Sequence, residues 1–300
     1  MNIEALRIFV DVMKHGSFAA VARQRDLDPS SVSRSISALE TELGVRLLQR
    51  TTRKLAPTEA GAEYFTRVEG PLREMERAGQ QALDLLGQPT GTLRVTACTS
   101  FGQRILAPLL PKLRELYPGL TIELVLADDH VDIVEEKIDL AVRFGGKPGA
   151  GFIASRLVPR RFHVCASLSY LGKWGRPENP RDLEKRDCLL FPMQGYRSTW
   201  KFRLKGKRPF EVPVTGHLIV SHGLTMTACA VQGLGPALLP DWLCRQEVAS
   251  GELVNLFPDY ECAPTDFDTA AWLVYPGRDY IPLKLRAFID FLRQEVTGYA

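Results

Sequence analysis

The spacing of apolar residues changes once along this chain, and this change limits its fold more than any other feature. Up to residue 86, apolar side chains recur every three or four positions, which is typical of amphipathic helices. From residue 91, short apolar runs alternate with helical segments, which is typical of βα units. The segment 87–91, Gly-Gln-Pro-Thr-Gly, separates the two parts and has the composition of a linker. The sequence therefore predicts a helical N-terminal part and an α/β C-terminal part.

The composition is that of an ordinary soluble globular protein, with 45% hydrophobic and 24% charged residues in a chain of 300. No run approaches the roughly 18 apolar residues of a membrane helix. Glu4, Arg7 and Asp11 interrupt the apolar pattern at the start, which argues against a signal peptide. The six cysteines include no C-x-x-C pair, which argues against a disulfide framework and a zinc site. We therefore expect a cytoplasmic protein with no membrane partner.

Three short helices are predicted in residues 1–58. The first begins at Ile3 and ends at His15-Gly16, because glycine accepts the left-handed conformation of a helix C-terminus. Ser17 is the expected N-cap of a second helix over 18–24. Asp28 followed by Pro29 predicts the start of a third helix, which Gly44 ends. The spacing predicts a helix-turn-helix over about Ala19 to Ala38.

The outward face of the third helix carries small hydroxyl side chains around one arginine. Small side chains let a helix approach a DNA groove, hydroxyls bond phosphates or bases, and arginine can bind guanine through two hydrogen bonds. The alternative is that the serines only favour a helix start and the arginine faces water. The residues are Ser30, Ser33, Arg34 and Ser37.

A basic segment follows the third helix. Between Arg34 and Lys54 the chain has five cations and two acids, and GVRLLQRTTRKLAPT (44–58) has the pattern of a short two-stranded wing. A basic wing beside a recognition helix can follow phosphates and enter the minor groove. Its candidate contacts are Arg50, Arg53 and Lys54.

The run LDPSSVSRSISALETELGVRLLQRTTRKLAPTEAG (27–61) resembles the winged helix-turn-helix of LysR-type transcriptional regulators. The similarity covers about 60 residues closely and continues more loosely through the whole chain. It implies a sequence-specific regulator that binds double-stranded DNA and responds to a small molecule, with no cofactor. By this resemblance Ser30, Ser33 and Arg34 would contact the major groove. The family assembles as homodimers or homotetramers.

A long linker helix is expected over 59–87, after the DNA-binding domain of 1–58. Its apolar positions follow a heptad pattern: Phe65, Val68, Leu72, Met75, Gly79, Ala82 and Leu86. One interpretation is a helix buried against its own domain, whereas the resemblance favours pairing with a second subunit. Gly70-Pro71 predicts a bend within one helix, because an interior proline removes a hydrogen bond.

Residues 91–300 are predicted to form a mostly parallel α/β structure. Strands are expected at 93–98, 120–128, 138–145, 152–158, 161–167, 218–221, 236–240 and 269–275. Helices are expected from Thr99 to about Tyr117, after residue 128, from His222, from Asp241 and over 281–295. The resemblance implies an effector-binding domain of two lobes, like those of periplasmic solute-binding proteins. Lobe 1 would hold about 91–160 and 267–300, and lobe 2 about 161–266.

No catalytic pattern is found, so we do not expect an enzyme. The five histidines make no close pair, and G-x-S-x-G and P-loop motifs are absent. Asp128, Asp129 and His130 resemble metal ligands, but helix capping after the strand explains Asp128 better. Two alternatives remain: an enzyme that carries a DNA-binding domain, and a solute-binding protein. The missing signal peptide and the contiguous 28–61 match argue against the second.

Ligands of open α/β sheets bind beyond the carboxyl ends of strands, where helix N-termini offer free amides. The first α/β strand ends at Thr99, Ser100 and Phe101, and another ends at Ser221 before His222. These residues either face each other across a cleft or are plain helix caps. The resemblance favours the cleft and adds Asp128 and Phe202. Asp128 argues against a simple carboxylate effector.

Overall fold

A computed structural model describes most of the chain, in two units that are treated separately, Met1–Leu86 and Gly87–Ala300. The described residues are 2–50, 55–85, 87–129, 131–146, 149, 151–159, 161–193, 195–277 and 280–296. Among them, no helix is long and apolar enough to cross a lipid bilayer.

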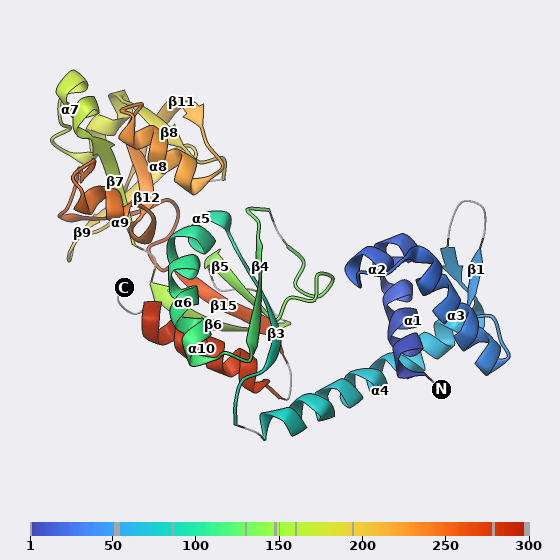
Figure 1. The fold of residues 1–300 in the computed structure, drawn as a ribbon. Coiled ribbons are helices and arrows are strands. Elements are labelled where there is room, and N and C mark those ends of the chain that lie inside the picture. Colours follow the sequence, from blue (N-terminus) through green and yellow to red (C-terminus); the bar gives the residue numbers. More distant parts are fainter. Residues whose placement is uncertain are drawn as a thin grey trace. The chain divides into compact units, whose positions relative to one another are not determined.

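The first unit begins with the three expected helices, α1 (Ile3–His15), α2 (Phe18–Gln24) and α3 (Pro29–Leu43) (Figure 1). Their inward faces form one apolar core in which Phe9 and Val21 are fully buried. Capping interactions explain where these helices begin and end. The Ser17 hydroxyl accepts a hydrogen bond from the amide of Ala20 (3.3 Å), and Gly44 ends α3 with φ +68°.

Asp28 differs from the prediction in one respect. It occupies the N-cap position of α3 with extended backbone, and Pro29 follows at the first helical position. Its carboxylate, however, accepts no capping hydrogen bond. The start of α3 therefore depends on the fixed φ of Pro29 and on packing rather than on a side-chain cap.

The wing consists of β1 (Leu48–Arg50) and β2 (Leu55–Pro57), which pair antiparallel. Arg53 and Lys54, and the side chain of Arg50, lie outside the described residues.

The linker helix α4 (Glu59–Asp84) continues through Pro71 as one element, as predicted. Its first half packs against its own domain: Leu72 is buried, and Phe65 and Val68 contact the same core. The next heptad position, Met75, is 54% exposed. The first half of the helix is thus buried against its own domain, whereas pairing of the second half with a second subunit and the bend near Gly70 stay predictions.

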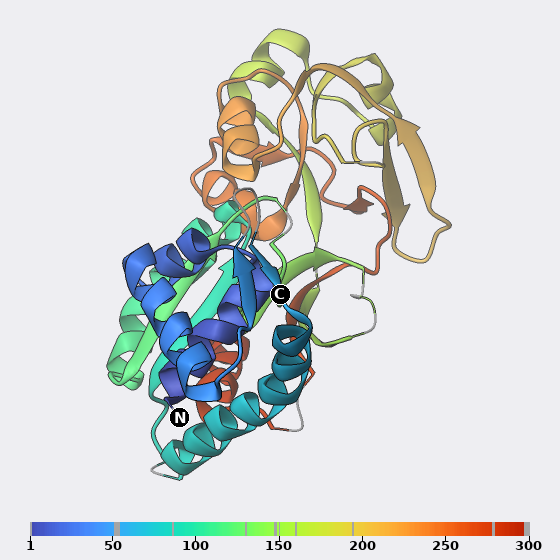
Figure 2. The same cartoon turned by 90° about the vertical axis from the view of Figure 1, so that its right-hand side faces the viewer.

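Lobe 1 of the second unit is built on a five-stranded sheet of order β4-β3-β5-β15-β6. Its strands are β3 (Gly91–Ala97), β4 (Leu120–Leu126), β5 (Leu140–Gly145), β6 (Phe152–Pro159) and β15 (Ala270–Pro276). The first helical segment comprises α5 (Thr99–Phe101), the π-helical turn η1 (Gly102–Leu106) and α6 (Ala107–Leu116). The C-terminal α10 (Leu283–Val296), drawn in red, packs on this sheet (Figure 1 and Figure 2).

Lobe 2 is built on an eight-stranded sheet of order β10-β9-β14-β7-β12-β8-β11, with β13 also paired to β7. Its strands are β7 (Phe162–Ser167), β8 (Asp187–Leu190), β9 (Thr199–Leu204), β10 (Phe210–Pro213), β11 (Thr215–Ile219), β12 (Ala237–Pro240), β13 (Leu253–Asn255) and β14 (Tyr260–Ala263). Its helices are α7 (Leu168–Trp174), the 3-10 helix η2 (Pro180–Lys185), α8 (Gly223–Val231) and α9 (Asp241–Ala249).

Two expectations for this unit were wrong, and one strand was displaced. The prediction of a mostly parallel arrangement fails in both lobes. In lobe 1, β15 pairs antiparallel with β5 and β6, and among the described strands only β3 pairs parallel, with β4 and β5. In lobe 2, β7 pairs antiparallel with β12, β13 and β14, as β9 does with β10 and β14. The short helix expected after residue 128 is absent from the described residues there, which form bends and turns. The strand expected at 218–221 lies earlier, at Thr215–Ile219.

Candidate DNA-binding surface and effector cleft

The outward face of α3 is a polar strip opposite a buried one. Ser30, Arg34 and Ser37 are exposed and Ser33 is half-buried. Val32, Ile36 and Leu39, on the other side, are fully buried. Positions 30, 33, 34 and 37 share one helical face because each turn takes 3.6 residues.

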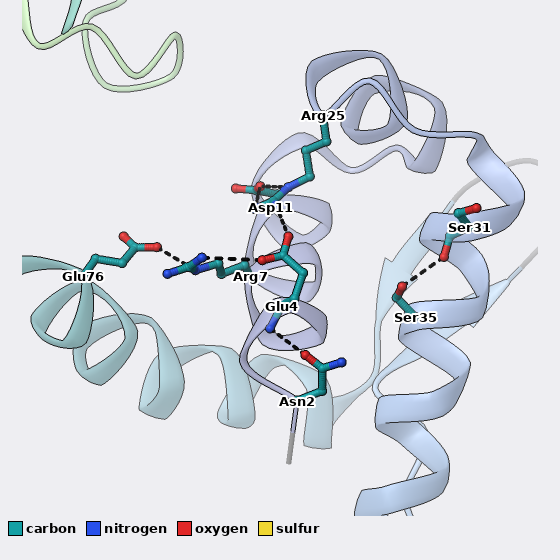
Figure 3. Close-up of polar contacts among 8 residues, drawn as sticks. All are labelled: Asn2, Glu4, Arg7, Asp11, Arg25, Ser31, Ser35 and Glu76. Carbon is teal, nitrogen blue, oxygen red and sulfur yellow. Dashed lines mark hydrogen bonds and ion pairs between the residues drawn. The ribbon is translucent and has the colours of Figure 1, made fainter. Parts of the chain in front are cut away.

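Ser31, which the sequence analysis did not single out, organises this strip from the first turn of α3. Its hydroxyl accepts a hydrogen bond from the Arg34 guanidinium (3.0 Å). Its carbonyl accepts one from the Ser35 hydroxyl (3.0 Å; Figure 3). Ser31 therefore restricts the rotamers of Arg34, which lowers the entropic cost of placing the guanidinium against DNA. The i, i+3 spacing of the two residues is the sequence signal that could have revealed this contact.

The base of the wing is held by one carboxylate and one hydroxyl. The amides of Leu47 and Leu48 both donate to Glu40 Oε1 (2.8 and 3.0 Å), which ties the wing to α3. The Thr58 hydroxyl donates to the carbonyl of Arg46 (2.7 Å), with the Leu47 carbonyl 3.1 Å away, and accepts from the amide of Gly61 (2.9 Å). The wing thus has a defined connection to α3 and to the start of α4.

A charge cluster joins α1 to the end of α2. The Arg25 guanidinium donates to Oδ2 of Asp11 through Nε (2.7 Å) and Nη2 (2.6 Å), and it also reaches Glu4 (Figure 3). Asp11 is buried, with a side chain 6% exposed, so its charge requires this partner. The cluster fixes α2, the first helix of the helix-turn-helix.

In the second unit, three of the predicted effector residues meet where the lobes touch. The Asp128 Oδ1 accepts a hydrogen bond from the Thr99 amide at the start of α5 (3.1 Å). Its Oδ2 lies 3.8 Å from Nε2 of His222, the residue that caps α8 in lobe 2. Asp128 therefore binds the first amide of α5 and bridges the lobes, whereas the helix after residue 128 that it was expected to cap is absent from the described residues.

Ser100 makes a second direct contact between the lobes. Its buried hydroxyl accepts a hydrogen bond from the amide of Leu224, in the first turn of α8 (3.2 Å). A Cβ on Gly223 would lie 2.9 Å from this oxygen, so the close approach requires glycine there. The N-terminal ends of α5 and α8 thus contact each other directly.

Aromatic side chains form the apolar wall near this junction. Phe101 contacts Phe144 and Trp242 edge-on, with ring centroids 5.3 and 5.4 Å apart, and Phe144 and Trp242 stack on each other. The Trp242 Nε1 is buried without a hydrogen-bond partner among the described residues. Phe144 and Trp242 were missed from the sequence because they lie far from Phe101 along the chain.

Two predicted effector residues are placed differently. Phe202 is fully buried in lobe 2, where it packs against Phe210, Phe257 and Tyr260. Phe202 is thus part of the lobe 2 core and is not among the described residues that contact Asp128 or Ser100. We therefore leave Phe202 out of the proposed site. Ser221 is exposed, directly before His222.

A cavity of about 510 Å³ lies along the same seam, between η1, α8 and α9. Arg104 reaches across it from lobe 1 and donates to Gln246 and Glu247 of lobe 2. Buried Arg104 Nε and Glu247 Oε2 have no hydrogen-bond partner among the described residues. The seam therefore contains polar atoms that a bound polar molecule or water could satisfy.

A winged helix-turn-helix with a polar, arginine-bearing recognition helix, followed by a two-lobed α/β unit, defines a DNA-binding transcriptional regulator with a separate effector domain. Comparisons with known proteins identify the family. Residues 3–62 match the bacterial regulatory helix-turn-helix of the lysR family, and residues 86–297 match the LysR substrate binding domain. The chain belongs to the LysR-type transcriptional regulators, as the sequence predicted.

Individual relatives are similar over nearly their whole length. The chain is 36% identical to the transcriptional regulator CrgA of Neisseria meningitidis serogroup C over 98% of this chain and 97% of CrgA. It is 33% identical to DmlR of Escherichia coli K12, over 96% and 92%. Among solved structures, CrgA from Neisseria meningitidis matches with a TM-score of 0.61 at 35% identity, covering 99% of each chain. The full-length Vibrio cholerae virulence activator AphB matches with a TM-score of 0.58 at 25% identity, covering 100% of this chain and 99% of AphB.

Proposed function

We propose that the outward face of α3 contacts base edges in the major groove of an operator, with the wing on the DNA backbone or in the minor groove. The observation that carries this proposal is the exposed strip of Ser30, Arg34 and Ser37, with Arg34 oriented by Ser31. The regulator would act in the cytoplasm as a homodimer or homotetramer on a two-fold-related site, because one small domain gives few specific contacts.

Arg34 is the residue expected to discriminate between sequences. A guanidinium that donates two hydrogen bonds to guanine contributes about 1–3 kcal/mol of discrimination. Arg34→Ala should therefore weaken operator binding by that amount and leave binding to random DNA nearly unchanged. Lys54→Ala should instead weaken binding to all sequences similarly and reduce the salt dependence, because phosphate contacts carry no sequence information.

The test begins with selection of preferred sites from a random duplex pool, followed by titration of the best site against salt. We expect a dyad-symmetric site and a log affinity that falls linearly with log salt. Arg67→Ala is the matched control, because Arg67 is 79% exposed on α4 and pairs only with neighbouring Glu63 among the described residues. Equal losses on operator and random DNA for Arg34→Ala would contradict the base contact.

We propose that a small-molecule effector binds where Thr99, Ser100, Asp128 and His222 meet. The carboxylate of Asp128 already occupies the first amide of α5, a position that a carboxylate effector would need. A neutral or cationic effector with a hydrogen-bond donor toward Asp128 fits this arrangement better than a carboxylate does. Binding would compete with the direct Ser100–Leu224 contact and so change how the lobes are held together.

Thermal unfolding of the full chain with a panel of polar metabolites tests the effector site. A compound that stabilises the wild type should stabilise Ser100→Ala or Asp128→Asn by a different amount, because the contacts at the junction change. Thr121→Ala, an exposed change on edge strand β4, should respond as the wild type does. A compound whose effect is the same in all four proteins binds elsewhere.

We infer that the chain acts by binding rather than by catalysis, since one matched family is named as a regulatory helix-turn-helix and the other as a substrate binding domain. Turnover of any metabolite by the fragment 91–300 would overturn this inference.

A further inference from the structure

Lobe 2 contains a second cavity that takes no part in the junction between the lobes. It has a volume of about 380 Å³ and lies between the start of β7 and helix α9. Its charged and titratable lining comes from two elements: Arg161 and His163 at β7, and Asp241, Cys244 and Arg245 on α9. Val248 and Ala249, one turn beyond Arg245 on α9, add an apolar part to the lining.

The fixed charges of this cavity do not balance. Asp241 Oδ2 lies 3.6 Å from Nη2 of Arg245, one helical turn away, and the Asp241 side chain is only 13% exposed. Arg161 makes no ion pair with any described residue. Arg161 therefore adds a positive charge to the cavity beside the Asp241–Arg245 pair, and a ligand of one negative charge would complement it.

His163 is held as a neutral donor at the floor of the cavity. The amide nitrogen of Asn255 lies 3.0 Å from Nδ1 of His163, and an amide nitrogen can only donate, so the imidazole proton resides on Nε2. Burial lowers the pKa of His163, against the opposing effect of Asp241, because the protein interior solvates the charged ring poorly. At neutral pH the ring adds an N–H donor to the cavity without adding charge.

We propose that this cavity binds a small organic monocarboxylate, with Arg161 and Arg245 on the carboxylate and the hydrocarbon part against Val248 and Ala249. A monoanion matches the excess charge, and guanidinium groups match the planar geometry of a carboxylate. The volume lies at the lower end of the range for small-molecule sites, so the ligand has only a few non-hydrogen atoms. This site is separate from the proposed effector junction and does not depend on it.

The affinity should rise as the pH falls. Asp241, whose pKa burial raises, and His163 gain protons as the pH falls and make the cavity more positive. The other charged or titratable side chains that line the cavity are those of Arg161, Arg245 and Cys244. By linkage, a bound carboxylate raises the pKa of His163.

Isothermal titration of the full-length protein with butyrate tests the site, with butylamine and inorganic phosphate as comparison probes. We expect butyrate to bind more tightly at pH about 6 than at pH about 7.5, and butylamine not to bind. Arg161→Gln and Arg245→Gln should each weaken butyrate at least about tenfold, since each removes a charged hydrogen-bond partner. Asp241→Asn should bind butyrate more tightly, because it removes the competing carboxylate and keeps the oxygen that accepts from the Trp242 amide (2.7 Å).

Matched variants separate binding in this cavity from binding elsewhere on the protein. Arg208→Gln makes the same substitution at an exposed position of lobe 2 and should leave butyrate binding unchanged. Ser100→Ala should also leave butyrate affinity unchanged. If Ser100→Ala weakens butyrate binding, the ligand binds at the effector junction and the proposal is overturned. No butyrate binding, tighter phosphate than butyrate binding, or equal losses in Arg208→Gln and Arg245→Gln would each overturn it as well. None of these results bears on operator binding by α3.

Discussion

Gly61 offers the most direct test of how the DNA-binding unit is assembled. It lies in the first turn of α4, where an ideal Cβ would stand 1.9 Å from the carbonyl oxygen of Leu47 and 2.8 Å from its carbon. Side-chain carbons essentially never approach other heavy atoms below 3.0 Å. The substitution Gly61→Ala therefore requires the backbone of the wing base to move relative to α4.

The expected cost follows from three contributions. Alanine gains about 1 kcal/mol over glycine in a helix interior. Overpacking against a fixed backbone costs about 1–3 kcal/mol. The amide of Thr58 donates to the Leu47 carbonyl (2.9 Å), and losing this bond costs about 1 kcal/mol, whereas the Thr58 hydroxyl keeps its shorter bond to the Arg46 carbonyl (2.7 Å). The net change in the free energy of unfolding is a destabilisation of about 1–3 kcal/mol, whereas helix propensity alone predicts a stabilisation.

Urea and thermal unfolding of the DNA-binding unit, followed by hydrogen exchange in the full chain, measure this effect. A loss of that size lowers the thermal unfolding midpoint of a domain of this length by roughly 4–24 °C, and operator affinity should fall with it because the wing base moves. Gly79→Ala is the matched control in the same helix. Its Cβ meets nothing within 4 Å, so we expect stabilisation of up to about 1 kcal/mol. If Gly61→Ala stabilises the unit as Gly79→Ala does, the close contact with Leu47 is not present in solution.

Two further predictions concern buried ionisable groups. Asp11→Asn should destabilise the first unit by about 1–3 kcal/mol, because it leaves the Arg25 guanidinium without its buried carboxylate; urea unfolding at neutral pH measures this, and an unchanged midpoint would contradict it. Burial raises the pKa of Cys188 and of Cys262 to about 12, from an ordinary value of 9.0. Between pH 9.0 and about 12 the thiols lose their protons in the unfolded chain but keep them in the folded protein. The free energy of unfolding should therefore fall over this pH range by about 1.4 kcal/mol per pH unit for each thiol, and these thiols should cause no such fall below pH 9.0. Unfolding free energies across this range should fall less steeply in a Cys188→Ala, Cys262→Ala variant, and equal slopes would refute the assignment.

The helical N-terminal part was the most predictable from sequence, because its signals are local. Ser17, Gly16 and Gly44 end or begin helices through hydrogen bonds and backbone conformations within a few residues. The same holds for the exposed strip of α3, since its helical face follows from spacing alone. Asp28 shows the limit: its position was correct, but the orientation of its carboxylate was not predictable.

Lobe 2 was the least predictable part. Strands β8, β9, β10, β13 and β14 were not expected, and the antiparallel pairing around β7 was missed. Short strands carry weak periodic signals, and their partners are set by contacts distant in sequence. Phe202 was assigned to a ligand site, although an aromatic residue in such a strand is also suited to the core, where the structure places it.

By itself, the sequence determined a winged helix-turn-helix, a long linker helix and an α/β effector part, because caps, turns and apolar spacing act over a few residues. Only the tertiary structure decided that Asp128 meets both Thr99 and His222, and that Arg161 and Arg245 line one cavity. Contacts of this kind, between residues far apart in the sequence, depend on which strands pair and on how the two lobes pack against each other. These choices are made by burial of the shared apolar core, a property of the whole unit rather than of any local segment.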